Sequence, residues 1–356
     1  MGQNNKYYFY FILFFFILIS LVIVIILIKK TEKKEKEENI IKNIEKGSKT
    51  VLITGGASGI GKSYAKFLLD KGYKVVIIDI KNAKEVSDEF SHKYGKNMVL
   101  GIKCDVTNKK QYKNAFEQAN KFSKDGIVDI LILNAAIYAE LFCNTDNLIN
   151  TNLIAPIYAS ELYIKQSTGN LQHKSKKEGL IIITSSIAGI RASDMEIIPV
   201  YNASKAGINQ FVRSMEPITS SYNLRINAVC PGSIVQTGMT KQYFNNTFDT
   251  LLMKGMLNIE GRGGVLQPED INPTMYRFIV DKSLNGDLIV VHPRSDGIPE
   301  PDLEKIKNDD GKTELFKDPS YISRKYGAYD FNSSPIVYLS SKHRMNQIKN
   351  TNCIWS

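Results

Sequence analysis

The 356-residue sequence predicts an α/β protein with a doubly wound parallel sheet, preceded by one transmembrane helix. From residue 50 onward, short apolar runs rich in β-branched residues alternate with longer segments of helical periodicity. This alternation is typical of parallel strands that helices cover on both faces. The expected strands are 51–53, 74–80, 98–104, 130–133, 180–184, 225–229 and 288–291. The expected helices are 60–70, 83–93, 108–124, 147–166 and 200–216.

Composition divides the chain into four parts. An uncharged segment at 7–28 precedes a Lys- and Glu-rich linker at 29–49. Residues 50–297 form the α/β domain, which is long enough to bury its own core. Residues 298–356 form a polar C-terminal extension, and an unstructured tail is one interpretation of it. An arm that packs on the domain or on a partner subunit is the other, because residues 336–339 are apolar.

Residues 7–28 are expected to form a membrane anchor, because they consist almost entirely of Phe, Ile, Leu, Val and Tyr. A helix of this length spans about 33 Å, and the hydrocarbon core of a bilayer is about 30 Å thick. A cleaved signal peptide is the alternative, but a charged run follows in place of a small-residue cleavage site. Five lysines lie within residues 29–36, and only Lys6 precedes the segment. The positive-inside rule therefore predicts a single-pass protein, expected in the endoplasmic reticulum, whose domain faces the cytosol.

Charge and metal-ligand spacing argue against two classes of partner. The net charge is +10, but the lysines are spread among many Asp and Glu residues, without a compact Arg-rich cluster. A nucleic-acid partner is therefore not expected, since such proteins concentrate their basic residues on one face. The four Cys and four His residues show no metal-ligand spacing, so we expect no metal site.

A glycine-rich turn, Thr54 to Gly61, joins the first expected strand to the first expected helix. Its glycines allow the backbone to approach a pyrophosphate, and the helix N-terminus offers free N–H groups. Asp79 follows at the end of the second strand, where its carboxylate can accept hydrogen bonds from adenosine ribose hydroxyls. The carboxylate would also repel a 2′-phosphate, so we expect NAD; Lys81 is the feature that favours NADP.

A tyrosine and a lysine four residues apart, Tyr201 and Lys205, would lie one turn apart on a helix. A nearby ammonium lowers the pKa of a phenol, which makes it a usable proton-transfer group near neutral pH. The same spacing recurs at 321/325 and at 338/342, so the spacing alone is not specific.

The first copy is distinguished by its surroundings. A serine pair, Ser185 and Ser186, lies upstream with the glycine-rich turn, and Pro231-Gly232 lies downstream. In this order the motifs resemble the active site of the short-chain dehydrogenase/reductase family, over about residues 50–297. The resemblance implies a Rossmann fold, an NAD(P)-dependent oxidoreductase that acts on alcohol groups, and a homodimer or homotetramer.

The resemblance also implies the site residues. Asn152, Ser186, Tyr201 and Lys205 would be catalytic, with Asn150 and Ser185 as alternatives to the first two. The tyrosine would transfer the proton, and the lysine would lower the pKa of the tyrosine and bind the nicotinamide ribose. The serine would hold the substrate oxygen, and the asparagine would support a water chain. The expected cofactor contacts are Gly55, Ser58, Gly59, Ile60, Gly61, Asp79, Asp105, Val106, Asn134, Tyr201, Lys205, Pro231, Gly232 and Thr237.

The expected substrate is apolar. Residues 238–266, which cover the substrate in relatives, are rich in Met, Phe and Leu and suit a lipid-like ligand. An amphipathic helix that buries its own face is an equal alternative for this stretch. Segments such as 224–232 resemble 15-hydroxyprostaglandin dehydrogenase-like members, which implies oxidation of a hydroxy fatty acid or prostaglandin. The alternatives are an NADPH-dependent carbonyl, steroid or retinoid reductase, and a catalytically silent, membrane-tethered scaffold that binds a nucleotide.

Overall fold

The computed structural model of the chain describes residues 47–138, 142, 144–190, 198–232, 234 and 266–291. Among these residues, no helix is both long enough and apolar enough to cross a membrane. The segment at 7–28 lies outside the described residues, as does the extension at 298–356. The membrane anchor and the fate of the extension therefore stay predictions from the sequence.

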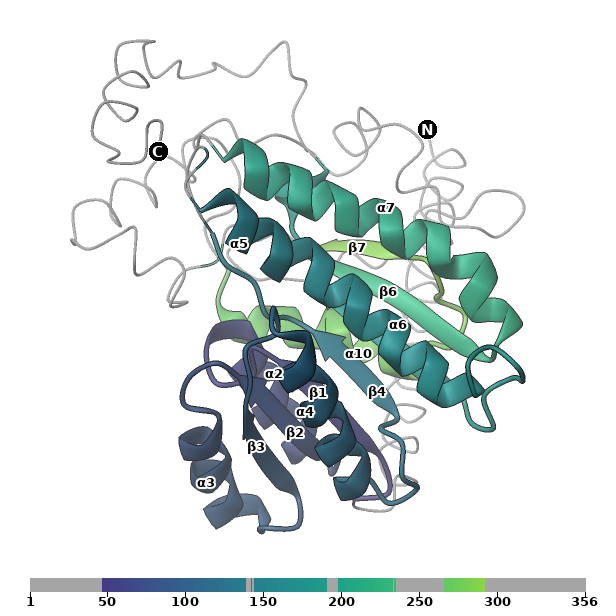
Figure 1. Ribbon diagram of the computed structural model, residues 1–356. Helices are drawn as coiled ribbons and strands as arrows, with labels where there is room; N and C mark the ends of the chain where they lie inside the picture. Colours follow the sequence, from purple (N-terminus) through teal and green to yellow (C-terminus); the bar gives the residue numbers. More distant parts are fainter. Residues whose placement is uncertain are drawn as a thin grey trace, which may run out of the picture. The chain divides into compact units, whose positions relative to one another are not determined.

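Seven parallel strands form one sheet in the order β3-β2-β1-β4-β5-β6-β7 (Figure 1). The strands are β1 (Thr50–Thr54), β2 (Lys74–Asp79), β3 (Val99–Lys103), β4 (Ile130–Leu133), β5 (Gly179–Thr184), β6 (Leu224–Pro231) and β7 (Leu288–Val291). The predicted doubly wound parallel sheet is confirmed. The chain first builds outward from β1 to β3 and then returns to add β4 beside β1. This change of direction is where open α/β sheets bind ligands, outside the carboxyl ends of the strands.

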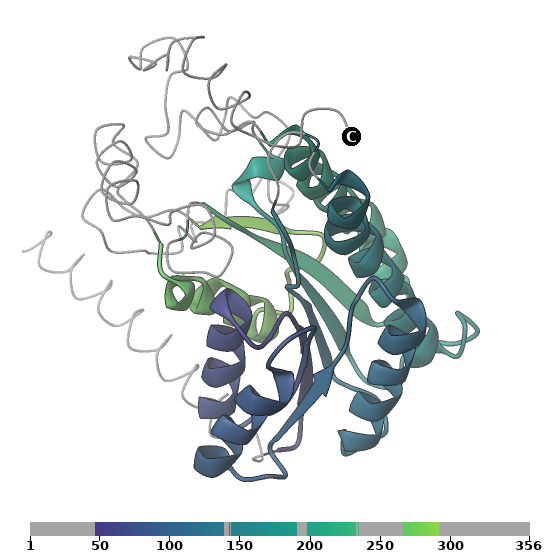
Figure 2. The same ribbon diagram turned by 60° about the vertical axis from the view of Figure 1, so that its left-hand side comes forward.

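Helices cover both faces of the sheet, as the sequence predicts. Figure 2 shows α4, α6 and α7 on one side, and α2, α3 and α10 on the other. The helices are α2 (Gly59–Asp70), α3 (Ala83–Tyr94), α4 (Lys109–Phe122), α5 (Thr145–Ile149), α6 (Ala155–Thr168), α7 (Pro199–Ser221) and α10 (Asn272–Val280). Two short 3-10 turns, η2 (Ile187–Gly189) and η3 (Pro268–Ile271), also lie among the described residues.

The expected helix at 147–166 is not a regular α-helix. A π-helical turn, η1 (Asn150–Ile154), lies between α5 and α6. π-Helical turns are rare and are frequent at functional sites. This one carries Asn152, so the irregularity changes the direction of a predicted catalytic side chain.

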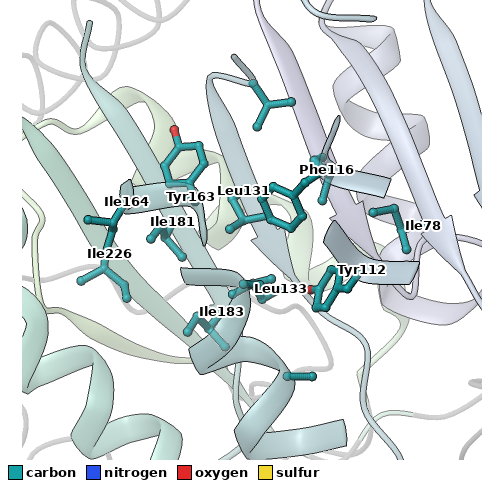
Figure 3. Packing of buried hydrophobic residues seen from close by; sticks show 14 of the residues in the cluster. Ile78, Tyr112, Phe116, Leu131, Leu133, Tyr163, Ile164, Ile181, Ile183 and Ile226 are labelled. Atoms are coloured by element: carbon teal, nitrogen blue, oxygen red, sulfur yellow. The ribbon is translucent and has the colours of Figure 1, made fainter. Parts of the chain in front are cut away.

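A large apolar cluster lies between the sheet and helices α4, α6 and α7 (Figure 3). The sheet contributes Leu131 of β4 and Ile181 of β5, while Phe116 of α4 and Tyr163 of α6 pack onto them. Each such side chain contributes about 1.5–3 kcal/mol when it is buried. Because helices cover the other face too, β1, β4, β5 and β6 are buried at every position. This is why these strands appear in the sequence as largely apolar runs, although β6 also holds the buried polar residues Arg225 and Asn227.

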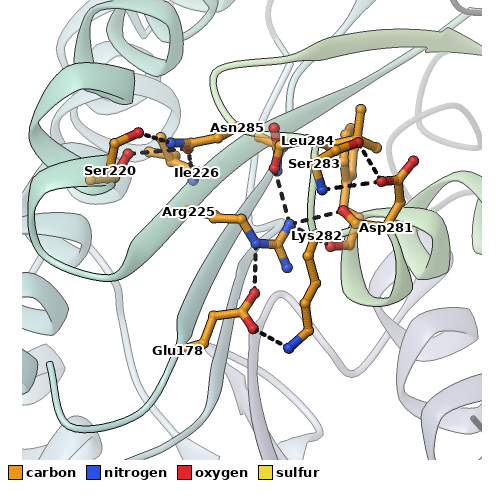
Figure 4. A network of polar contacts seen from close by, with 12 residues as sticks. Glu178, Ser220, Arg225, Ile226, Asp281, Lys282, Ser283, Leu284 and Asn285 are labelled. Atoms are coloured by element: carbon orange, nitrogen blue, oxygen red, sulfur yellow. Dashed lines mark hydrogen bonds and ion pairs between the residues drawn. The ribbon is translucent and has the colours of Figure 1, made fainter.

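A buried arginine ties β6 to α10 and to the loop that leads into β7 (Figure 4). Arg225 Nη1 donates to the carbonyl oxygens of Phe278 (2.9 Å), Asp281 (3.2 Å) and Leu284 (3.0 Å). Its Nε donates to Glu178 Oε1 at 2.7 Å. The guanidinium thus satisfies backbone carbonyls at the end of a helix, which have no partner within the helix itself.

Candidate active site

The predicted site residues meet at one edge of the sheet. The glycine-rich turn follows β1, Asn134 follows β4, the serine pair follows β5, and Gly232 follows β6. These four strands are neighbours in a parallel sheet, so their carboxyl ends lie side by side. Motifs that are up to about 180 residues apart in the sequence therefore converge at the point where the topology reverses.

The turn between β1 and α2 requires its glycines. Gly55 and Gly59 have φ angles of +63° and +50°, a region that disfavours other residues. A Cβ atom added to Gly61 would lie 2.1 Å from the Gly55 carbonyl oxygen, which is too close for any side chain. The chain therefore folds tightly and leaves the N-terminus of α2 open. No acidic residue occupies the first turn of this described helix, and the Ser58 side chain does not cap it. These features fit a bound pyrophosphate.

Asn134 holds the glycine-rich turn against the loop that follows β4. Its Nδ2 donates to the carbonyl oxygens of Thr54 (3.3 Å) and Gly55 (3.2 Å). The Thr54 hydroxyl in turn accepts from the N–H groups of Asn134 (3.0 Å) and Ala135 (3.1 Å). Asn134 therefore fixes the backbone of the glycine-rich turn through these hydrogen bonds.

The Asp79 carboxylate is fixed beside the same turn. Its Oδ2 accepts from Ala57 N at 3.0 Å, and its Oδ1 accepts from Lys81 N at 3.1 Å. A carboxylate has about four lone-pair sites, so two backbone donors leave acceptor capacity for ribose hydroxyls. Lys81 supplies a backbone donor here, and its side chain is exposed.

Asp105 and Val106 follow β3, which is an edge strand of the sheet. Asp105 Oδ1 accepts from the backbone N (2.9 Å) and the hydroxyl (2.7 Å) of Thr107. Val106 packs against the main apolar cluster. Both residues are half-buried, so they shape the loop and stay accessible.

Lys205 lies deep in the site, with only 3% of its surface exposed. Its Nζ donates to the Thr184 carbonyl oxygen at 3.0 Å and lies 5.7 Å from the centre of the Tyr201 ring. Burial lowers the pKa of this lysine from 10.5 to about 8. The side chain can therefore change its charge close to physiological pH, beside the phenol whose ionisation it would tune.

Asn152 links the loop after β4 to the helix that carries Tyr201. Its amide exchanges two 2.8 Å hydrogen bonds with the backbone of Ile137, and its Nδ2 lies 3.3 Å from Ser204 Oγ. Ser204 Oγ donates to the Tyr201 carbonyl oxygen at 2.7 Å. Asn150, the alternative, is exposed, whereas Asn152 is 1% exposed. The geometry thus brings Asn152 to the predicted site.

The two serines after β5 have different surroundings. Ser185 is buried, and its hydroxyl donates to Asn209 Oδ1 at 2.6 Å, which ties it to α7. Ser186 is half-buried, and its Oγ accepts from Ala188 N at 3.1 Å at the start of η2. The structure therefore uses Ser185 to hold α7 and leaves Ser186 as the more accessible serine.

Apolar side chains surround Tyr201. It packs in a small cluster with Leu148 and Ile198, against which Ile137 and Tyr138 also lie. The Tyr138 and Tyr201 rings are 5.4 Å apart at their centroids. The Tyr201 ring therefore packs among apolar and aromatic side chains.

The comparisons with known proteins agree with this geometry. A model of the short chain dehydrogenase family matches residues 49–247, more than half of the chain. The chain belongs to this family. Rattus norvegicus 15-hydroxyprostaglandin dehydrogenase (NAD(+)) is 30% identical over 258 residues, which cover 68% of this chain and 90% of that protein. Carbonyl reductase family member 4 of Danio rerio is 30% identical over 199 residues, 54% of this chain and 78% of that protein.

Solved structures of dehydrogenases have a similar fold. 4-Hydroxyisoleucine dehydrogenase complexed with NADH has a TM-score of 0.58 at 25% identity, over 68% of this chain and 96% of that one. Membership in the short-chain dehydrogenase family, predicted from the order of the motifs, is confirmed. The chain is thus an NAD(P)-binding oxidoreductase by family, and its fold neighbours include complexes with NADH and with NADP.

Not every predicted site residue of this short-chain dehydrogenase can be placed. Thr237 lies outside the described residues, as does the expected substrate cover, except for Leu266. Pro231 ends β6, and the Gly232 N–H donates to the Val291 carbonyl oxygen at 2.9 Å, which fixes this turn beside β7. Two residues at the site were missed from the sequence, Thr184 and Tyr138. Thr184 could have been noticed as a polar residue that ends an otherwise apolar strand.

Proposed function

We propose that this enzyme oxidises a secondary alcohol of an apolar, lipid-like substrate with NAD, and reduces the ketone in the reverse direction. A hydroxy fatty acid or a prostaglandin-type compound is the substrate class that we favour. The observation that carries the proposal is the position of Tyr201, which lies beside the buried ammonium of Lys205 within an apolar cluster.

Each catalytic side chain has a role that its surroundings support. Lys205 stabilises the Tyr201 phenolate, and this phenolate accepts the proton of the substrate hydroxyl and becomes a neutral phenol. Ser186 donates to the substrate oxygen, where charge develops. Asn152 orders the loop and helix around this pair and supports proton exchange with solvent. A bound nicotinamide ring supplies the hydride acceptor for the oxidation.

Asp79 supports NAD as the cofactor. Its carboxylate is held beside the glycine-rich turn by the N–H groups of Ala57 and Lys81. In folds of this kind an acidic residue after the second strand binds the adenosine ribose. A 2′-phosphate there would meet a like charge. The exposed Lys81 side chain is the feature that favours the second candidate, an NADPH-dependent carbonyl reductase, and one relative is named a carbonyl reductase.

The apolar surroundings of Tyr201 and the 15-hydroxyprostaglandin dehydrogenase relatives support a lipid-like substrate. In this proposal residues 7–28 hold the enzyme in the endoplasmic reticulum membrane, with the domain in the cytosol. An enzyme so anchored would take its substrate from the lipid phase beside it. Pairing of subunits, by analogy with the family, is part of the same proposal.

The test is turnover by the full-length protein. NAD and NADP would each be offered with hydroxy fatty acids, steroid alcohols and retinol, and the absorbance of the reduced nicotinamide would be followed. We expect turnover with NAD and a hydroxy fatty acid. Turnover only with NADPH and a carbonyl compound would support the reductase. Binding of NAD without turnover of any of these alcohols would favour a silent scaffold.

A further inference from the structure

A buried asparagine lies one helical turn beyond Lys205 on α7. Asn209 is 6% exposed, and the proposed mechanism does not use it. Its Oδ1 accepts from Ser185 Oγ at 2.6 Å and from Cys230 Sγ at 3.7 Å. Ser185 follows β5, and Cys230 lies near the end of β6, which is the neighbouring strand. One amide oxygen of α7 therefore contacts the ends of two strands that form the site.

Two side chains of α7 reach two consecutive residues at the end of β5. Lys205 Nζ donates to the Thr184 carbonyl oxygen at 3.0 Å, while Asn209 Oδ1 accepts from the Ser185 hydroxyl. Residues four apart on a helix lie on the same face, so the two contacts are adjacent. The contact from Asn209 carries no charge, and it therefore holds the end of β5 against α7 in both protonation states of the lysine.

The backbone of the lysine is packed closely against η2 as well. A Cβ atom added to Gly189 would lie 2.6 Å from the Lys205 carbonyl oxygen, so this glycine allows η2 to pack directly on α7. Ser185 Oγ lies 3.4 Å from the same carbonyl oxygen. Ser186, the proposed donor to the substrate, is the N-cap of η2. A shift of α7 against the end of β5 would therefore displace both the lysine and the active serine.

The Asn209 amide also has a feature that destabilises the fold. Its Nδ2 is buried and has no hydrogen-bond partner among the described residues. A buried donor without a partner lowers stability, whereas an apolar side chain of similar shape would avoid this loss. Proteins keep such locally unfavourable residues mainly at functional sites. This observation favours a role for Asn209 in the reaction.

We propose that Asn209 is a positioning residue, which holds the end of β5 against α7 through Ser185 and so keeps Lys205 and Ser186 in their reacting positions. Without the Asn209 hydrogen bond, the contact between Lys205 Nζ and the Thr184 carbonyl oxygen should lengthen or break. The consequence for the rate rests on the proposed dehydrogenase function, whereas this geometric consequence does not.

The loss of this position should change the pH dependence of the reaction. A displaced lysine stabilises the Tyr201 phenolate less well, so the pKa of Tyr201 rises. Alcohol oxidation needs the phenolate, and the acidic limb of the pH profile of kcat/KM should therefore move to higher pH. Tyr138 of the loop after β4 and Cys230 of β6 also lie near this pair. Both are neutral near pH 7, since a phenol titrates near pH 10 and burial raises the pKa of Cys230 to about 12.

The experiment compares the full-length protein with Asn209→Leu, Ser185→Ala and the double variant. Each single variant leaves a buried polar group without its partner and should unfold at a lower temperature. The double variant replaces both partners by apolar groups, so its unfolding temperature should return close to that of the wild type. Its kinetics should not return. We expect kcat/KM to stay about 10- to 100-fold low, because a misplacement of about 1 Å can cost 100-fold, with the acidic limb at higher pH.

Thr219→Val is the matched control. Thr219 is also buried on α7, and its hydroxyl donates to Asn285 Oδ1 at 3.1 Å. It lies about four helical turns beyond Lys205, roughly 20 Å along the helix axis. This variant should lower the unfolding temperature and leave the pH profile unchanged.

Crystal structures of the wild type and of Asn209→Leu give a readout that needs no turnover. The contact between Lys205 Nζ and the Thr184 carbonyl oxygen should be present in the wild type and lost in the variant. The proposal is overturned if the variant keeps this contact. It is also overturned if the double variant regains the wild-type rate and pH profile together with its stability, because Asn209 would then have a structural role only.

Two further results are distinguishable from these. If Asn209→Leu does not fold, the crystal structure and the pH profile of the double variant decide the same question. If the wild type turns over none of the offered alcohols, the dehydrogenase function fails, and the crystal structures alone decide whether Asn209 positions Lys205.

Discussion

Lys205 donates a 3.0 Å hydrogen bond to the Thr184 carbonyl oxygen, at the point where β5 ends and the serine pair begins. The side chain is buried, and burial lowers its pKa from 10.5 to about 8. One backbone acceptor therefore compensates only part of the lost hydration of the ammonium. The buried ammonium of Lys205 is therefore destabilised relative to an ammonium in water, at the position where the proposed reaction uses it. The free energy of unfolding should depend on pH as a result.

Stability should depend on pH through Lys205. Between pH 8 and 10.5 the folded protein binds fewer protons at this residue than the unfolded chain does, so the free energy of unfolding rises with pH. Each pKa unit corresponds to about 1.4 kcal/mol, so the whole effect is on the order of 3 kcal/mol. Lys205→Met should lack it. The measurement is denaturant unfolding of both proteins from pH 7 to pH 10, without added nucleotide. If the free energy of unfolding changes with pH in the same way in both proteins, the pKa of Lys205 is not lowered in the folded state.

Tyr201→Phe should lower kcat by about 10²- to 10⁴-fold, which is the usual contribution of a proton-transfer group. The fold and the affinity for NADH should change little, because the phenyl ring keeps its place against Tyr138. Tyr321→Phe is the matched control, since Tyr321 and Lys325 have the same spacing in the sequence. Turnover is measured as nicotinamide reduction, and NADH affinity by fluorescence. If the Tyr201→Phe enzyme turns over at the wild-type rate, Tyr201 is not the proton-transfer group and the proposed mechanism is wrong.

The sequence predicts the sheet well because its strands are buried on both faces and have few polar interruptions. The π-helical turn at Asn150–Ile154 could not be predicted, since its residues also suit a regular helix and tertiary contacts decide between the two. The helix α10 was missed, because its nine residues contain a proline and several β-branched or aromatic residues. Lys205 was found by its spacing from Tyr201, but its acceptor is a backbone carbonyl, which no sequence pattern reveals.

Asp79→Asn should change the cofactor preference. The substitution removes the charge that would repel a 2′-phosphate, while an amide oxygen can still accept from Ala57 N–H or Lys81 N–H. A hydrogen bond to a charged group is worth about 1.5–3 kcal/mol, so the ratio of kcat/KM for NAD over NADP should fall roughly 10-fold or more. Lys81→Ala should move the ratio the other way, because it removes a cation near the ribose. A ratio that stays constant in both variants would exclude Asp79 as the discriminating residue.

Arg225→Met should strongly destabilise the fold, because Arg225 is a buried partner of Glu178 and of three carbonyl oxygens. The removal of one member of a buried ion pair costs about 3–5 kcal/mol. Lys282→Met is the matched control: Lys282 pairs with the same carboxylate at 2.7 Å, but its side chain is 71% exposed, against 10% for Arg225. Exposed pairs contribute about 0–1 kcal/mol, so this variant should unfold nearly like the wild type. Urea unfolding of the three proteins measures the difference. Equal losses in the two variants would mean that the Glu178 ion pair, and not the hydrogen bonds from Arg225 to the carbonyl oxygens, stabilises the link between β6 and α10.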